Sequence, residues 1–527
     1  MSAGQGESPE SVRGLLRHSW IYSLAPIAQR LLSIVLIRLY TKRLSIGEFG
    51  VLEIVDLLIL IVPQLVGINL LGGLTRFYFE HDDPRRRAQV VSSTTIALAI
   101  SSFVAAIVAL LARGPLSELL FSLRDGELAD GRDHALFLAI LIVPFSICTA
   151  SGLRYLQILK LSRTSTAIQL AKTVVEAALK LWMLFGLDMG VSGFLLSILI
   201  SEVVCALAFS LWMALRLRTG FDWGVFRPLL HFSLPLLPLG LVQLGLHQFG
   251  KLVIEHLGPQ QRFEGSSNGL EITVATAWVG VFGIGYKIAF LFHSAVLTPF
   301  MQIWQPHVFG LPREQRRGEL VRLGDWALVA LCAFYLPAAV FGRQAVDLLS
   351  GGPEYRAAWR VTPIVVAAYL CYGSYAMSQV ALMAEKRTWS LLVVNVAALA
   401  LGIALGVTLV PRWEEHGYTA AALATLGCFA PLAFGAEWTA ARCGWRSRSA
   451  GTSVKLLSLV ALALVGAWFV DMNRDPLAPG ALPLVLGVKL GWMALVYALL
   501  WRVGLDRAGR EGLSRLVHDA LAKFRRR

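Results

Sequence analysis

Residues 81–112 read HDDPRRRAQVVSSTTIALAISSFVAAIVALLA and decide the class of fold. A charged loop ends in three arginines, and no ionisable side chain follows from residue 88 to residue 112. A helix of about 20 predominantly apolar residues is long enough to cross the hydrocarbon core of a bilayer. The stretch is therefore predicted to be a membrane span. Its start is expected on the cytoplasmic side, because arginines accumulate in cytoplasmic loops.

The composition extends this prediction to the whole chain. Of its 527 residues, 56% are hydrophobic and 16% are charged, against roughly 25% charged in ordinary globular proteins. A soluble protein of this length has no core large enough for so many apolar side chains, so a soluble enzyme and a disordered chain are excluded. The net charge of +14 lies in short loops between apolar runs. That placement is typical of membrane topology and predicts no nucleic-acid partner.

Apolar runs of span length recur along the chain, and residues 1–18 before them are polar without the apolar region of a cleavable signal. The sequence thus predicts an all-α polytopic membrane protein with about 14 transmembrane helices, and the first span anchors the chain. The runs lie near residues 19–40, 49–71, 88–112, 134–156, 165–187, 190–214, 229–257, 273–300, 322–342, 359–383, 388–410, 419–440, 453–470 and 480–502.

Lysine and arginine are concentrated in alternate loops, which sets the orientation. Arg85-Arg86-Arg87, Arg313/Arg316/Arg317 and the C-terminal tail all lie on the richer side. Both termini are therefore expected in the cytoplasm, in agreement with an even number of spans, and the chain in a bacterial inner membrane. The tail, residues 503–527, is basic and amphipathic. It suits a helix lying on the cytoplasmic leaflet, with a solvated basic tail as the alternative.

Weak internal echoes indicate a repeat. Ser19, Pro26 and Arg38 are matched by Ser233, Pro238 and Lys251, and Glu48-Phe49-Gly50-Val51 by Val281-Phe282-Gly283-Ile284; Ser162-Arg163-Thr164 is matched by Lys386-Arg387-Thr388. Repeats of this kind are common in transporters. We predict two pseudo-symmetric six-helix lobes, residues 19–228 and 229–445, followed by two C-terminal spans in residues 446–502. Residues 259–278 form an insert in an outside loop.

Several ionisable residues lie inside the predicted spans, where each costs at least about 2.5–3.5 kcal/mol and should face a cavity or a partner. Cations prevail slightly, and they suit an anionic substrate such as a pyrophosphate, which arginine and lysine bind well. The cations predicted to bind substrate are Arg30, Arg38, Lys172, Lys180, Lys251 and Lys287. The acids predicted to form a gate or ion pairs are Glu53, Asp56, Glu176 and Glu255.

Each of these assignments has a structural alternative. Lys172/Glu176/Lys180 and Lys251/Glu255 are spaced i, i+4 and can neutralise each other on one helix. Arg38 can extend to an interface, whereas Arg30 and Lys287 have no evident local partner in the sequence. Glu53 and Asp56 can pair with Arg30 or Arg38 as a structural lock, or they can work as a gate.

Aromatic and amide side chains are candidates for contacts with sugars. Tyr372, Tyr375 and Gln379 fall on one face of the predicted span 359–383. Aromatic stacking combined with amide hydrogen bonds is a common scheme of ligand recognition. Aromatic residues in membrane spans also serve packing or interfacial belts, and both interpretations stay open.

Three stretches resemble the Wzx-type polysaccharide flippases of the multidrug/oligosaccharidyl-lipid/polysaccharide exporter superfamily. They are YTKRLSIGEFGVLEIVDLL at 40–58, LTRFYFEHDDPRRR at 74–87, and GVFGIGYKIAFLF at 280–292 with QIWQPHVF at 302–309. The resemblance spans roughly residues 15–450 and departs from the family at the insert. It implies two lobes around a central cavity, alternating access, and a polyprenyl-pyrophosphate-linked oligosaccharide as cargo. Membrane lipids and a polysaccharide polymerase or glycosyltransferase are the further expected partners.

Other functions remain as alternatives. A drug or cation antiporter of the same superfamily should concentrate carboxylates, and a lipid II flippase is closer in chemistry. A membrane glycosyltransferase or polymer ligase needs an organised catalytic constellation, which the outside loops 113–133 and 258–272 lack. The sequence has no GxxxxGK[ST] motif, and its six cysteines have no metal-binding spacing. We therefore predict a transporter with no catalytic residue, metal or cofactor.

Overall fold

The computed structural model describes a helical protein. It covers residue 32, residues 35–122 except 68, residues 130–263, residues 272–444 except 311, 312, 386 and 414, parts of 458–471, and residues 481–500 and 502. Within these ranges the only β-type pairing is an isolated antiparallel bridge between Arg262 and Thr273. The bridge joins two positions of the insert predicted at 259–278. Arg30 and the tail predicted at 503–527 lie outside the described residues.

Helices divide between two compact units. The first unit is Met1–Gly280 with Leu349–Glu354, and the second is Val281–Leu348 with Tyr355–Arg527. The first contains α2 (Ile46–Val66), α3 (Leu70–Glu80), α4 (Pro84–Leu111), α5 (Arg113–Leu120), α6 (Asp130–Ile158), α7 (Ser162–Leu181), η1 (Trp182–Gly186), α8 (Gly190–Leu217), α9 (Trp223–Ser233), η2 (Leu234–Leu236) and α10 (Leu237–Leu257). Helix α11 (Val274–Gly310) passes from the first unit into the second.

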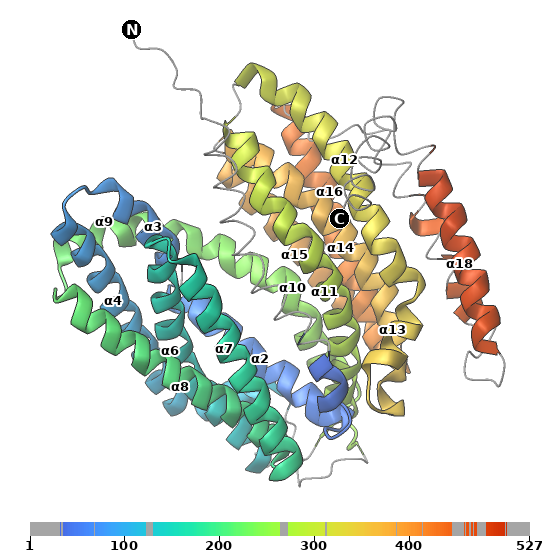
Figure 1. Cartoon of the computed structure of the whole chain (residues 1–527). Coiled ribbons are helices and arrows are strands. Elements are labelled where there is room, and N and C mark those ends of the chain that lie inside the picture. The colour runs from blue at the N-terminus through green and yellow to red at the C-terminus, as the bar shows by residue number, and fades with distance from the viewer. Residues whose placement is uncertain are drawn as a thin grey trace, which may run out of the picture. The chain divides into compact units, whose positions relative to one another are not determined.

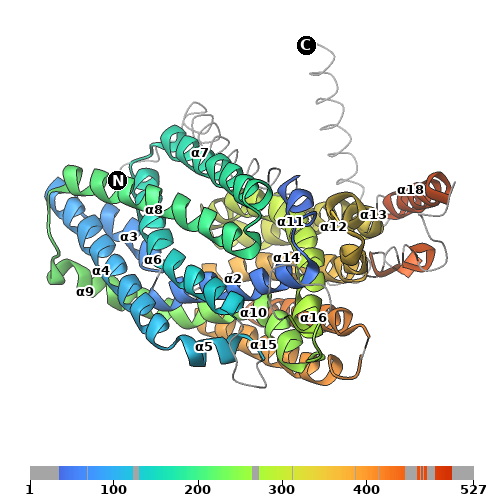
Figure 2. The ribbon, with the colours of Figure 1, turned by 90° about the horizontal axis from the view of Figure 1, so that it is seen from below.

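The second unit continues with the remaining helices. They are α12 (Arg313–Val340), α13 (Gly342–Leu349), η3 (Pro353–Arg360), α14 (Val361–Ala384), α15 (Thr388–Leu409), α16 (Gly417–Arg442) and α18 (Ala481–Leu499). Helix α14 packs against α16 and α12, and α15 packs against α16. Figure 2 shows α15 and α16 lying side by side.

The predicted membrane class is confirmed. Nine helices in the described part are long and apolar enough to cross a membrane, or ten if the pair bent by 63° between Val340 and Gly342 counts as one span. Predicted spans at 88–112, 134–156 and 190–214 correspond to α4, α6 and α8. Those at 19–40 and 453–470 fall largely outside the described residues. The chain is a multi-pass membrane protein.

Polar residues at the span ends set where the helices begin. Asp83 caps α4 by accepting hydrogen bonds from the backbone N–H groups of Arg85 and Arg86, and Pro84 occupies the first turn. Ser45 and Glu48 form a reciprocal capping box at the start of α2. Such caps satisfy N–H groups that have no partner within the helix. The charged loop before α4 therefore also determines where this helix starts.

The first unit is built around α6, which packs against α2, α4 and α8. Figure 1 shows α6, α7 and α8 running alongside one another. Helix α2 also makes a close approach to the first turns of α11. A Cβ atom on Gly50 would lie 1.9 Å from the carbonyl oxygen of Thr276, and one on Gly280 would lie 2.1 Å from that of Ile46. Small residues allow backbones in membranes to approach this closely.

This close approach predicts that Gly50→Ala is destabilising. The added methyl group would clash with the backbone of α11, which cannot rotate aside as a side chain can. Overpacking of this kind costs about 1–3 kcal/mol. Gly72→Ala on α3 is the matched control, because a Cβ atom added there would have nothing within 4 Å. Thermal unfolding of the detergent-solubilised protein should show a lower midpoint for G50A and an unchanged or higher one for G72A. Equal midpoints would contradict the close approach.

Candidate functional site

Four ionisable side chains form a connected network between α7 and α8. The Nζ atom of Lys172 lies 2.8 Å from Oε1 of Glu202 and 3.5 Å from Oε2 of Glu176. Glu176 also pairs with Lys180 at 2.6 Å and accepts a hydrogen bond of 3.4 Å from the Ser201 hydroxyl. We call Lys172, Glu176, Lys180 and Glu202 the α7–α8 network. The predicted i, i+4 pairing on α7 is present, and α8 adds a second carboxylate.

The network is formally neutral and partly accessible. Side-chain exposure is 19% for Lys172, 20% for Glu176, and 11% for both Lys180 and Glu202. The ammonium group of Lys180 also lies 4.3 Å from the centre of the Phe194 ring, a cation–π contact. The two lysines are thus held in place by carboxylates and, for Lys180, also by an aromatic face. An anion bound here would compete with Glu176 and Glu202 for the same ammonium groups.

A second ion pair in the first unit is sealed. Lys251 on α10 lies 2.9 Å from Oε2 of Glu53 on α2, and the two side chains are 5% and 1% exposed. We call Lys251 and Glu53 the sealed pair. It joins α10 to α2 within the unit, and the role of Glu53 as a structural lock or a gate stays a prediction. Lys251 is its cationic partner here, where the sequence suggested Arg30 or Arg38.

Glu255 has its own contacts one turn along α10. Both of its carboxylate oxygens lie 3.0 Å from the hydroxyl of Thr276 on α11, which donates to the carboxylate, and the residue is fully buried. Both predicted acids, Glu53 and Glu255, therefore tie α10 to neighbouring helices. These contacts are of the kind that keeps buried charges tolerable inside a membrane protein.

The remaining predicted ionisable residues have different surroundings. Arg38 is exposed on a helical segment before α2, Asp56 is half-buried on α2, and Lys287 is half-buried on the part of α11 that belongs to the second unit. These three residues take no part in the ion pairs of the α7–α8 network or in the sealed pair. The predicted roles of these three stay predictions.

Tyr372, Tyr375 and Gln379 lie on α14 in the second unit. Tyr375 is fully buried, and its hydroxyl donates to Oδ1 of Asn395 (3.2 Å) and accepts from Nδ2 of the same residue (2.9 Å). Tyr372 is half-buried, with its ring centre 5.2 Å from that of Phe429. The surroundings of Tyr375 favour the packing interpretation, and those of Tyr372 and Gln379 leave a sugar contact open.

Two polar groups in these units have contacts that the sequence does not reveal. Glu202 is recognisable as an acid within a span, but its pairing with Lys172 joins different helices and no local spacing reveals it. His293 on α11 stacks on Tyr369 at 4.3 Å and lies 2.8 Å from the Tyr335 hydroxyl through Nδ1. In the sequence, His293 can be recognised as a histidine within an apolar run. Over the part of the chain that the structure describes, no group of three metal-ligating side chains occurs.

The fold is shared with known exporters. The chain is similar to a structure of the lipid II flippase MurJ in an inward closed conformation, at 10% identity and a TM-score of 0.66, over 91% of this chain and 98% of that one. It is also similar to the Vibrio cholerae MATE transporter VcmN, at 16% identity and a TM-score of 0.57, over 83% and 97% of the two chains. At these identities the likeness establishes the fold alone, an all-α membrane fold like that of MurJ and VcmN.

A sequence comparison finds a family match over part of the chain. Residues 35–261 match the profile of the family described as polysaccharide biosynthesis protein. Among curated proteins, no sequence matches the chain. The family match and the shared fold together confirm the resemblance to the exporter superfamily that the motifs at 40–58, 74–87 and 280–309 indicate.

Proposed function

We propose that the chain flips a polyprenyl-pyrophosphate-linked oligosaccharide from the cytoplasmic to the outer leaflet of a bacterial inner membrane, by alternating access, for surface polysaccharide synthesis. The observation that carries this proposal is the polysaccharide biosynthesis match over residues 35–261. That segment contains the whole α7–α8 network and the sealed pair. We therefore propose that lysines in this segment contact the anionic headgroup of the cargo.

The α7–α8 network is the proposed headgroup contact. Its lysines are partly exposed, whereas the sealed pair is closed to any ligand. Pyrophosphate offers several anionic oxygens, and each lysine binds one as a point charge. The oxygens can replace Glu202 on Lys172 and Glu176 on Lys180 with little movement, because the ammonium groups are already positioned. The sealed pair holds α2 to α10 while this exchange takes place.

The membrane potential favours the proposed direction. Moving one negative charge outward across an inside-negative potential is worth about 2.3 kcal/mol per 100 mV. A pyrophosphate headgroup therefore gains from leaving the cytoplasmic side even without a gradient of the cargo. The polyprenyl chain stays in lipid throughout, so the protein has only the polar headgroup to shield.

The proposal is tested by deleting the gene and analysing undecaprenyl-linked saccharides on each face of the inner membrane. Complete repeat units should accumulate on the cytoplasmic face, and the wild-type chain should restore their transfer. Normal transfer with unpolymerised or unligated units on the outer face would exclude the flippase and favour the polymerase or ligase alternative.

Lys287 provides a test in the second unit. We expect Lys287→Ala to lower export by about 10-fold or more, the effect of losing one charge-assisted contact worth about 1.5–3 kcal/mol. Arg356→Ala is the matched control: its side chain is 52% exposed and its nearest carboxylate, on Asp347, is 3.9 Å away. The export assay is the transfer of labelled repeat units in the deletion strain. If K287A and R356A export equally, Lys287 lies outside the substrate path.

A lipid II flippase is the second candidate, favoured by the similarity in fold to MurJ. Lipid II also joins a polyprenyl pyrophosphate to a sugar headgroup, so the α7–α8 network would serve both cargoes alike. A drug antiporter is the third, from the MATE likeness. The cargo decides between them: transfer of lipid II in place of the oligosaccharide would support the second, and proton- or sodium-linked efflux of organic cations the third.

A further inference from the structure

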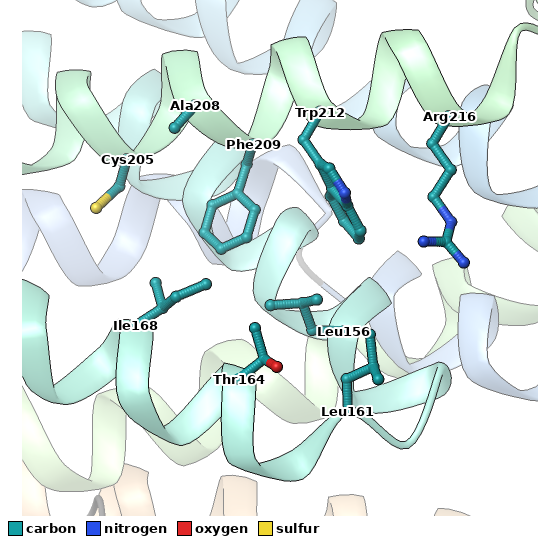
Figure 3. A pocket seen from close by; sticks show the side chains of 9 residues that line it. All are labelled: Leu156, Leu161, Thr164, Ile168, Cys205, Ala208, Phe209, Trp212 and Arg216. Carbon is teal, nitrogen blue, oxygen red and sulfur yellow. The ribbon is translucent and has the colours of Figure 1, made fainter.

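The first unit contains a pocket of about 400 Å³ between α6, α7 and α8, whose lining includes Cys205, a neighbour of the α7–α8 network. Figure 3 shows Cys205, Ala208, Phe209, Trp212 and Arg216 of α8 facing Leu161, Thr164 and Ile168 at the start of α7. Leu156 of α6 completes the lining. Thr164 and Arg216 are its polar members, and the other seven side chains are apolar. The pocket thus has the character of a site for a hydrocarbon chain with a polar end.

The inner wall of the pocket is closed. Phe209 is 6% exposed and packs directly on Gly152 of α6, where a Cβ atom would lie 2.2 Å from the Phe209 ring. On the other side, the pocket is bordered by exposed residues, among them Ala208 and Leu161. A ligand would therefore come in from the outer surface of α7 and α8. Their surface also exposes Val174, Leu207 and Leu211, as expected for a face in contact with lipid.

The polar end of the pocket is strongly basic. Arg216 stands in the last turn of α8 with its guanidinium 5.6 Å from the Trp212 ring centre, and it lies at the same end as Leu161 (Figure 3). The turn between α6 and α7 adds Lys160 and the first turn of α7 adds Arg163, both exposed. By the positive-inside rule this end faces the cytoplasm. Basic pockets between helices on that side suit anionic lipid headgroups.

We propose that this pocket binds an anionic phospholipid of the cytoplasmic leaflet, with one acyl chain between α6, α7 and α8 and its phosphate at Arg216. If a methylene group occupies about as much space as a water molecule, ~30 Å³, the pocket has room for roughly a dozen of them. That is one acyl chain, and much less than a long polyprenyl chain. The site is therefore assigned to a resident lipid and not to the cargo proposed above.

Native mass spectrometry of the purified full-length chain tests the assignment, with phosphatidylglycerol, phosphatidylethanolamine of the same acyl chains, and undecaprenyl phosphate as probes. Wild type should retain phosphatidylglycerol at a several-fold lower concentration than phosphatidylethanolamine, because both carry a phosphate but the ammonium group of phosphatidylethanolamine is repelled by Arg216 and the other cations at this end of the pocket. Arg216→Gln should remove this preference. Arg218→Gln is the control, because its side chain is exposed and its Nε donates to the Leu215 carbonyl.

A pair of variants tests the acyl-chain part separately. Ala208→Phe fills the pocket, whereas Leu207→Phe enlarges a 62% exposed side chain that does not line it. A208F should weaken binding of both phospholipids, and L207F should not; all four variants should elute as monodisperse protein, since each site is exposed. Equal behaviour of R216Q and R218Q, or of A208F and L207F, would overturn the assignment. Preferential, Arg216-dependent retention of undecaprenyl phosphate would overturn it as well and give the pocket to the cargo lipid.

Discussion

Replacing Lys172 by Met together with Glu202 by Gln should lower export by about 10- to 100-fold while the protein stays folded. The double change removes one cation and one anion, so the Lys180–Glu176 pair remains and the network stays neutral. Export falls because the cargo loses a charge-assisted contact worth about 1.5–3 kcal/mol. The measurement is transfer of labelled repeat units, corrected for the amount of folded protein in the membrane.

The sealed pair supplies the matched control. Lys251→Met alone leaves Glu53 buried without its ion pair, a change that costs about 3–5 kcal/mol. Adding Glu53→Gln removes the stranded charge, so the double variant should recover both folding and most of its export. Full export by K172M/E202Q would contradict the proposed contact with the cargo and leave the α7–α8 network a purely structural role. Loss of export by a well-folded K251M/E53Q would show that the sealed pair moves during transport.

Lys489→Met should cost about 3–5 kcal/mol of stability in the second unit. Lys489 on α18 is fully buried and lies 2.7 Å from Oδ1 of Asp471, and its ammonium also donates to the Val340 carbonyl (2.7 Å) and to Gln344 (2.9 Å). The side chain therefore fixes α18 to the end of α12 and to α13. Without it, the carboxylate of Asp471, which is 6% exposed, stays buried without its cation.

A compensating change separates charge from packing at this site. Asp471→Asn in the Lys489→Met background removes the unpaired charge, so K489M/D471N should unfold at a higher temperature than K489M. The measurement is the midpoint of thermal unfolding of the detergent-solubilised protein. Limited proteolysis, as a second measurement, shows whether α18 is cleaved off before the rest of the chain unfolds. If K489M unfolds like wild type, the buried pair contributes nothing to holding α18.

The spans themselves can be predicted from the sequence because hydropathy is a local property. The run without ionisable residues at 88–112 forms α4, and the helix starts earlier, at Pro84, because Asp83 caps it. The run at 165–187 forms α7 and η1. Helix α7 carries Lys172, Glu176 and Lys180 and is not among the helices of the described part that are apolar enough to cross a membrane, so this span stays a prediction. The i, i+4 pairing of these three residues is likewise local and therefore predictable.

Contacts between helices cannot be predicted in the same way. Lys251 has Glu255 four residues on, yet its ion pair is with Glu53, nearly two hundred positions earlier in the chain. That pairing depends on how α10 packs against α2, and Glu202 reaches Lys172 only because α8 folds back on α7. The close approach at Gly50 has the same origin. The glycine itself is visible within the motif EFGV, but its neighbour Thr276 is not.

Reconstitution tests the proposed flipping most directly. Purified chain is placed in liposomes that contain polyprenyl-pyrophosphate-linked oligosaccharide, and a glycosidase added outside cleaves only what the outer leaflet presents. We expect wild-type vesicles to expose nearly all of the oligosaccharide, and vesicles with K172M/E202Q or without protein to expose only the share that began in the outer leaflet. If wild-type vesicles behave like protein-free ones under an imposed membrane potential, the chain does not flip this lipid.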